Sequence, residues 1–283
     1  MQSDKPEFKY TWEEAVEILR NDPAQQDLIF CSYLTRDLIV NCERFASSDE
    51  FFEALRLLGQ FAPGARRLLD MPGGNGIATY AFARANFDVT SVEPDPSPMM
   101  GRGAIEHVLG ASGIKATIVD AYGEALPFAA DAFDVVYVRQ GLHHARDLPR
   151  MMTELSRVLR PSGVLLACRE HVVDNYGEGL QAFLDSQVDH QLYGGENAFT
   201  LPDYRSAIDG GGLKIELELG PYDSPINAYP NTPEALRHKV LESGPGRILR
   251  KVLPDDMVAA IGAWHVKRRK LAGRLYSFLA VKR

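Results

Sequence analysis

An acid and three glycines stand where the hydrophobic pattern of the chain changes. Asp70 ends an apolar run that predicts a buried strand, and Gly73, Gly74 and Gly76 precede a helical pattern over 77–85. Glycines at such places let bare backbone approach a ligand and expose the first N–H groups of the helix. This arrangement predicts a nucleotide-binding turn, although similar turns also close ordinary strand–helix units.

A second acid strengthens this interpretation. Glu93 follows the apolar run 89–92 and lies 17 residues after Gly76. Doubly wound folds place an acid about 20 residues beyond the glycines, where its two oxygens accept hydrogen bonds from adjacent ribose hydroxyls. The two acids and the glycines together predict a nucleotide-like cofactor.

Alternating strands and helices must position these residues. We predict strands near 66–72, 88–94, 115–121, 133–139, 163–171, 213–219 and 274–281, with helices near 76–86, 98–111 and 147–159. Residues 160–163 predict a turn into the fifth strand. This order predicts an α/β fold with a doubly wound, seven-stranded and mostly parallel sheet.

Further helices surround this pattern. Residues 1–62 have helical spacing, a capping box at Thr11 and no strand of their own, so we predict a helical lid over the ligand site. Residues 63–283 are predicted to form the main domain. Substrate-side insertions are expected near 174–205 and 221–272.

Composition restricts the partners. The 283 residues are 45% hydrophobic and 24% charged, which is typical of a compact globular chain, and the net charge of −7 opposes binding to nucleic acid. Apolar runs are too short for a membrane span. The N-terminus lacks a secretory pattern and the three cysteines form no paired pattern, so we expect the reducing cytoplasm. The oligomeric state is open.

Five motifs carry a resemblance that covers residues 64–172. They are Leu69–Gly76, Val92–Pro94, Leu126–Phe128 with Phe133–Val136, Leu142–His144 and Leu159–Gly163. Together they resemble the class I S-adenosylmethionine-dependent methyltransferases, and most closely small-molecule enzymes of the ubiquinone and menaquinone type. Pro72 replaces the first glycine of the usual motif. The resemblance implies that residues 63–283 form a methyltransferase domain that acts on a small molecule.

The resemblance also implies cofactor roles. Asp70 would hold the methionine ammonium, Gly74 and Gly76 would let the chain pass the cofactor, and Glu93 would bind both ribose hydroxyls. The full set of implied cofactor residues is Asp70, Gly73, Gly74, Gly76, Glu93, Pro94, Asp120, Tyr122, Gly123, Arg139 and Gln140.

Two parts of the cofactor site need separate interpretation. Relatives often carry an aspartate where this chain has Tyr122, so either Tyr122 with the Gly123 N–H or Asp120 is expected at the adenine, and the first is preferred. Arg139 and Gln140 follow the fourth strand and are expected at the methionine end of the cofactor.

Methyl transfer from a sulfonium requires that the acceptor atom, the methyl carbon and the sulfur are aligned and that water is excluded. A base is needed only if the acceptor is protonated. His143 resembles the catalytic histidine of phosphoethanolamine methyltransferases. The predicted catalytic residues are His143, His144, His171 and Tyr193. The two adjacent histidines have an equally good structural interpretation as caps of the next helix. The acceptor atom is not determined.

Three alternatives are open. The first is a metal-assisted enzyme, whose ligands would come from His143, His144, Glu170, His171 and Glu196. No tight ligand spacing supports it, so no metal is expected. The same fold also serves non-catalytic proteins that bind S-adenosylmethionine or nucleotides. A nicotinamide dehydrogenase is less favoured, because its fingerprint does not call for an acid ahead of the glycines.

Overall fold

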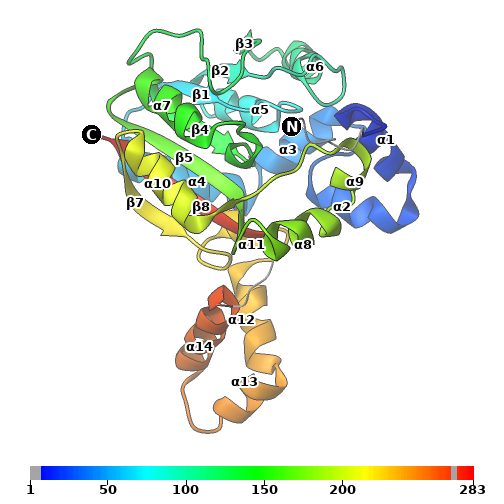
Figure 1. Cartoon of the computed structure of the whole chain (residues 1–283), viewed down its shortest axis with the longest axis vertical. Helices are drawn as coiled ribbons and strands as arrows, with labels where there is room; N and C mark the ends of the chain where they lie inside the picture. Colours follow the sequence, from blue (N-terminus) through cyan, green and yellow to red (C-terminus); the bar gives the residue numbers. More distant parts are fainter. Residues whose placement is uncertain (1–7, 269–272) are drawn as a thin grey trace.

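A central sheet organises the molecule (Figure 1). The computed structural model describes residues 8–268 and 273–283, and within them seven strands follow the order β3-β2-β1-β4-β5-β8-β7. They are β1 (Arg67–Asp70), β2 (Asp88–Val92), β3 (Thr117–Val119), β4 (Phe133–Arg139), β5 (Leu159–Val173), β7 (Leu213–Leu219) and β8 (Arg274–Lys282). Only β8 runs antiparallel to its neighbours along this path. The predicted doubly wound, mostly parallel sheet is confirmed.

Two details of the sheet differ from the prediction. A short eighth strand, β6 (Phe199–Thr200), pairs with the end of β5. The predicted turn at 160–163 lies inside β5, which begins at Leu159. Phe133 pairs with Leu159 but Val135 pairs with Val164, so the extra residues form an irregularity like a β-bulge instead of ending the strand.

Helices cover both faces of the sheet and complete two cores. They are α3 (Leu38–Ala46), α4 (Asp49–Phe61), α5 (Ile77–Arg84), α6 (Arg102–Ser112), α7 (Leu148–Val158) and α10 (Leu201–Gly210). Leu68 and Val135 face the core with α3 to α6, whereas Leu69 and Val136 face the core with α7 and α10. The alternation has the period of two that a strand imposes.

The N-terminal helices divide into two groups. The first group contains α1 (Trp12–Asn21), a short 3-10 helix (Pro23–Gln25) and α2 (Gln26–Cys31), and its buried side chains form a small cluster with Met100. Thr11 caps α1 with the predicted capping box. In contrast, α3 and α4 bury Phe45 and Phe51 in the same core as the sheet. The first group therefore packs in a small cluster of its own, whereas α3 and α4 are part of the main core.

The remaining helical segments follow β4, β5 and β7. They are a 3-10 turn (Leu142–His144) after β4, α8 (Glu178–Ser186), α9 (His190–Tyr193), α11 (Pro225–Ala228), α12 (Pro233–Glu242), α13 (Gly244–Leu249) and α14 (Asp255–Arg268). The last four lie within the predicted insertion at 221–272, of which residues 269–272 fall outside the described residues. No helix in the described part of the chain combines the length and hydrophobicity that crossing a bilayer requires.

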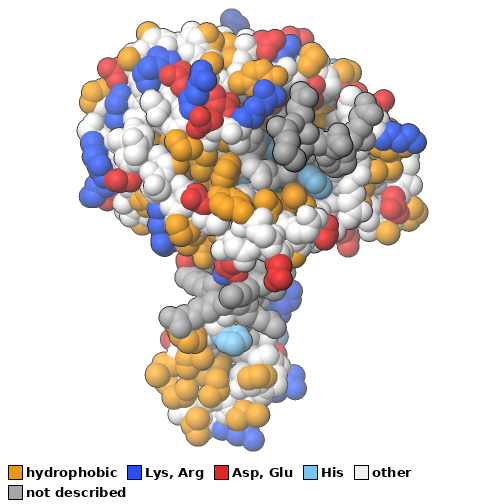
Figure 2. Space-filling view, in the orientation of Figure 1, with side chains coloured by type: hydrophobic (Ala, Val, Ile, Leu, Met, Phe, Trp, Pro, Cys, Tyr) orange, Lys and Arg blue, Asp and Glu red, His pale blue; other side chains and the backbone are white. Residues whose placement is uncertain are grey.

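An arm made of α12, α13 and α14 projects from the body (Figure 1). It is inserted between β7 and β8, and its helices contact one another. Ile248 and Val252 on this arm are 68% and 77% exposed, and Figure 2 shows hydrophobic side chains on its outer surface.

Candidate active site

The glycine turn connects β1 to α5 and leaves room beside its backbone. Gly74 and Gly76 have φ angles of 51° and 89°, in the left-handed region that favours glycine. A Cβ at Gly73 would lie 2.1 Å from the Ser91 hydroxyl, whereas a Cβ at Gly74 would meet no atom within 4 Å. Gly73 is therefore required by packing, and Gly74 borders open space.

Glu93, just beyond β2, is tied to the glycine turn. Its Oε2 accepts a hydrogen bond of 2.7 Å from the Gly74 N–H, and its Oε1 accepts one of 2.9 Å from the Asp95 N–H. Arg102 in turn donates to the carbonyl oxygens of Glu93 and Pro94, at 2.9 and 2.7 Å. The acid that the sequence assigns to the ribose is thus fixed beside Gly74.

Asp70 is fully buried and has one carboxylate oxygen without a partner. Oδ2 accepts a 2.6 Å hydrogen bond from the Thr79 hydroxyl, but Oδ1 has no hydrogen-bond partner among the described residues. Burial raises the pKa of Asp70 to about 7. A buried, unpartnered carboxylate oxygen is costly unless a donor or cation meets it. Together with the open space at Gly74, it fits a cofactor that carries an ammonium group.

The two candidates for adenine binding, Asp120 and Tyr122 with Gly123, have different surroundings. Asp120 forms an ion pair of 3.1 Å with Arg102, the residue that also holds the Glu93 carbonyl. Tyr122 is 55% exposed, with the Arg146 guanidinium 5.3 Å from its ring centre. A Cβ at Gly123 would lie 2.6 Å from the Met151 methyl group and 2.8 Å from that of Met71, so the backbone here packs against two flexible side chains. Both interpretations stay predictions.

Arg139 and Gln140 lie at the end of β4, as predicted. The Arg139 guanidinium pairs with Glu50 of α4 and donates a 2.9 Å hydrogen bond to the Gln140 side-chain oxygen. Gln140 has a positive φ of 51°. Arg139 therefore has partners within the protein, and direct contact of either residue with the cofactor stays a prediction.

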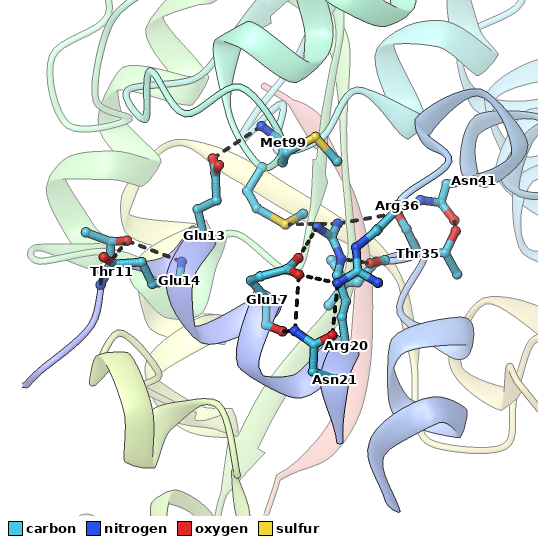
Figure 3. Close-up of polar contacts among 12 residues, drawn as sticks. Thr11, Glu13, Glu14, Glu17, Arg20, Asn21, Thr35, Arg36, Asn41 and Met99 are labelled. Carbon is cyan, nitrogen blue, oxygen red and sulfur yellow. Dashed lines mark hydrogen bonds and ion pairs between the residues drawn. The ribbon is translucent and has the colours of Figure 1, made fainter. Parts of the chain in front are cut away.

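The N-terminal helices contact the cofactor side of the sheet. The Asn75 side chain of the glycine turn donates a 2.7 Å hydrogen bond to the Tyr33 carbonyl. Glu13 of α1 accepts a 3.2 Å hydrogen bond from the Met99 N–H (Figure 3). Arg20 donates at 2.6 Å to the Leu34 carbonyl and so joins α1 to the chain that precedes α3. The N-terminal segment thus touches both the glycine turn and the loop after β2.

A second cluster of polar side chains lies at the ends of β4 and β5. His143 is buried, and its Nδ1 lies 2.8 Å from Oε2 of the fully buried Glu170. Glu170 also accepts from the N–H groups of Gly141 and His143, each at 3.1 Å. Burial lowers the pKa of His143 well below its usual value. This residue is therefore a neutral imidazole near pH 7 and not an imidazolium.

His171 and Glu196 complete this cluster. The ring centres of His143 and His171 are 4.9 Å apart, and Nε2 of His143 lies 3.6 Å from Oε2 of Glu196. Burial and the neighbouring His143 lower the pKa of His171 to about 3. The Tyr193 hydroxyl donates a 2.6 Å hydrogen bond to Oε1 of Glu196. Three of the four predicted catalytic residues therefore meet around Glu196.

His144 faces a different partner. Its Nδ1 lies 3.0 Å from the Gly195 carbonyl, and its ring packs 4.2 Å from that of His143. The structural interpretation as a helix cap fits neither histidine, because Asp147 caps α7 by accepting from the Arg150 N–H.

The two clusters are in contact. A Cβ at Gly141 would lie 2.3 Å from the Pro72 ring, so the loop after β4 packs directly on the glycine turn. Parallel sheets bind ligands at the carboxyl ends of their strands, and β1, β2, β4 and β5 all contribute here.

Sequence reasoning missed two polar residues of this region. Thr79 donates a hydrogen bond to Asp70 and lies among apolar residues of α5. A single hydroxyl residue in an apolar run was the sequence signal that could have identified it. Glu50 has no such signal, because an acid in the first turn of a helix is usual.

Comparison with known proteins supports this description. The match to the family model for the methyltransferase domain covers residues 69–167. A curated relative from Mycobacterium sp. strain KMS, named as an uncharacterized methyltransferase, is 36% identical over 102 residues, which are 36% of this chain and 38% of that protein. The chain therefore spans about two fifths of the length of the curated relatives that it matches.

Solved structures share the fold over a larger part of the chain. Geranyl diphosphate methyltransferase in complex with GPP and sinefungin aligns with a TM-score of 0.58 and 14% identity, covering 96% of this chain and 99% of that one. The [4+2]-cyclase SpnF aligns with a TM-score of 0.54 and 19% identity, covering 81% and 80%. Identities this low establish the fold alone.

The fold is that of the class I S-adenosylmethionine-dependent methyltransferases. Residues 69–167 match the family model of the methyltransferase domain, and the five motifs of the predicted resemblance lie in or beside this range. The closer likeness to enzymes of the ubiquinone and menaquinone type stays a prediction.

Proposed function

We propose that this protein is an enzyme that transfers a methyl group from S-adenosylmethionine to a small-molecule acceptor. The observation that carries the proposal is the unpartnered Oδ1 of buried Asp70, which ends the strand that leads into the open turn at Gly74. A cationic ammonium would satisfy this oxygen by a charge-assisted hydrogen bond. Because residues 69–167 match a methyltransferase domain, we take the cationic ligand to be the methyl donor S-adenosylmethionine.

The other cofactor contacts follow from the same turn. Glu93 has both oxygens anchored by backbone N–H groups, and each oxygen keeps a second lone pair for a ribose hydroxyl. Tyr122, with the Gly123 N–H, is proposed at the adenine. The cofactor supplies an activated methyl group when bound, and the chain's own residues orient it and exclude water.

The acceptor is proposed to bind at the cluster of His143, His171, Tyr193 and Glu196. The loop after β4 joins this cluster to the glycine turn through the packing of Gly141 on Pro72. The burial of His143 keeps its imidazole neutral, which is the form able to take a proton from an acceptor. We further propose a cytoplasmic location, with Cys31, Cys42 and Cys168 as free thiols.

A calorimetric titration tests the cofactor assignment. We expect S-adenosylmethionine and S-adenosylhomocysteine to bind with one site per chain, and NAD to show no binding at the same concentration. Absence of S-adenosylmethionine binding by the folded protein would overturn the proposal.

Methyl transfer needs a separate measurement, because one neighbour in fold is named as a cyclase. The protein is incubated with methyl-labelled S-adenosylmethionine and pools of small hydroxyl, amine and thiol compounds. Labelled product and S-adenosylhomocysteine are expected in equal amounts. Cofactor binding without product across these pools would favour the non-catalytic alternative.

A further inference from the structure

We propose that His143, His171 and Glu196 bind a divalent first-row transition metal ion. Each residue offers one ligand atom, and these three atoms lie within 4.8 Å of one another. These three residues were among the possible ligands of the metal-assisted alternative, but no metal was expected from the sequence because the residues lack tight spacing along the chain. They come from the loop after β4, from β5 and from the loop before β6.

Hydrogen bonds fix the orientation of each ligand. The Nδ1 of His143 faces Glu170 at 2.8 Å, and the Nδ1 of His171 faces the Gly273 carbonyl at 3.2 Å. A carbonyl oxygen and a carboxylate accept, so each Nδ1 donates its N–H. Histidines that bind metals are held in this way by a carboxylate or a backbone carbonyl.

The remaining polar atoms of these residues are acceptors, and one ligand atom of each residue lies within 4.8 Å of the other two. With Nδ1 protonated in each neutral ring, Nε2 of His143 and Nε2 of His171 carry lone pairs. Glu196 uses Oε1 to accept from the Tyr193 hydroxyl and turns Oε2 toward His143, 3.6 Å from its Nε2. Three converging acceptors do not satisfy one another, whereas a cation between them would satisfy all three.

The ligand types select the class of metal. Two imidazole nitrogens and one carboxylate suit zinc, iron or cobalt, whereas magnesium and calcium prefer oxygen ligands. Bonds of about 2.1 Å place neighbouring ligand atoms about 3–3.5 Å apart, so the side chains must close by about 1–1.5 Å around the ion. Three protein ligands leave open positions, which an oxygen atom of water or of an acceptor would fill. With its Nε2 on the ion, His143 cannot also accept a proton from the acceptor, so it acts as a base only when the site holds no ion.

Metal binding can be tested without reference to methyl transfer. Protein freed of metal with a chelator is titrated with Co²⁺ and Zn²⁺, and with Mg²⁺ as the comparison ion. We expect one equivalent of Co²⁺ with d–d absorption bands of a nitrogen and oxygen site, displacement by Zn²⁺, and much weaker binding of Mg²⁺. The melting temperature should rise with Zn²⁺ concentration, because the ion binds the native state.

Two variants locate the ion. Glu196→Gln and His171→Asn should each weaken Co²⁺ binding by more than the roughly 10–100-fold that loss of an outer hydrogen-bond partner costs. His107→Gln, a change of an exposed histidine on α6, is the matched control and should bind like the wild type. Circular dichroism verifies that each variant is folded, and Glu196→Gln keeps the size of the side chain and an oxygen that can accept from the Tyr193 hydroxyl.

The outcomes separate this proposal from the proposed function. Absence of Co²⁺ binding by the wild-type protein, or unchanged binding by both ligand variants, would overturn the metal site while S-adenosylmethionine binding still tests the function. Stoichiometric Co²⁺ binding that Glu196→Gln abolishes would establish the site even if the protein transfers no methyl group.

Discussion

Arg139 at the end of β4 and Glu50 of α4 form a buried, two-point ion pair. The guanidinium Nε lies 2.7 Å from Oε1 and Nη2 lies 3.2 Å from Oε2, with the two side chains 10% and 1% exposed. This pair fastens the N-terminal helices to the edge of the sheet that carries the candidate cofactor site.

Removing Glu50 should therefore destabilise the whole protein. Glu50→Ala leaves a buried guanidinium without its counter-ion, and we expect a loss of about 3–5 kcal/mol in the free energy of unfolding. Urea denaturation measures this change. The control is Glu53→Ala on the same helix, whose partner Arg56 is 58% exposed, and it should cost at most about 1 kcal/mol. Equal losses in the two variants would contradict the role given to the buried pair.

Asp70 should make cofactor affinity depend on pH. Its pKa of about 7 means that the folded protein without cofactor loses this proton only near neutral pH. The contribution to stability is complete below the unfolded pKa of about 3.9 and is lost as the pH rises through 7. A cationic ligand favours the ionised form, so its binding has the opposite dependence.

We expect the affinity for S-adenosylmethionine to fall between pH 7 and pH 5, approaching about tenfold per pH unit. Binding near pH 7 should also release a proton, which calorimetry in buffers of different ionisation enthalpy detects. Asp70→Asn should bind more weakly at pH 7 and show a much flatter dependence. A steep dependence retained in that variant would assign the titration to another group.

A side chain at Gly74 should affect cofactor binding more than folding. The Cβ of Gly74→Ala meets no atom within 4 Å, so the variant pays only the cost of its left-handed backbone, about 1–2 kcal/mol. The methyl group would occupy the space proposed for the cofactor. Gly64→Ala is the matched control, because Gly64 has a φ of 78° and is equally open, but precedes β1. Calorimetry should find loss of S-adenosylmethionine binding in the Gly74 variant alone.

The proposed lid should be restricted to the first helices. Because α3 and α4 share the core of the sheet whereas α1 and α2 do not, we expect protease cleavage within 8–35 and not within 38–61. S-adenosylhomocysteine should slow this cleavage markedly. Equal cleavage rates with and without the ligand would indicate that α1 and α2 are an independent appendage.

The residues that the sequence predicted best are those whose role is local. The glycines at 73, 74 and 76 were identifiable because one turn requires them, and the central strands because continuous apolar runs suit a sheet covered on both faces. Thr11 capped its helix as predicted because a capping box involves four consecutive residues.

Relationships between distant segments were not accessible in the same way. Glu50 reads as an ordinary helix-start acid, and its partner is 89 residues further along the chain. Glu196 lies in a loop whose path depends on how α8 and α9 pack, so the sequence could name it with His143 and His171 as a possible ligand but could not tell which of the five candidates come together. The irregularity in β5 was likewise read as a turn, because local residue types do not tell whether a strand continues beyond it.

The arm of α12 to α14 has a consequence for cooperativity. Its buried side chains, Leu241 and Val258, belong to neither of the two cores that hold the sheet. The arm follows β7 and α11 in the chain and precedes β8, and β7 and β8 pair with each other. We therefore expect the arm to open and close as a separate unit of hydrogen exchange, so that its amides exchange without loss of protection in the sheet, which hydrogen-exchange mass spectrometry would measure.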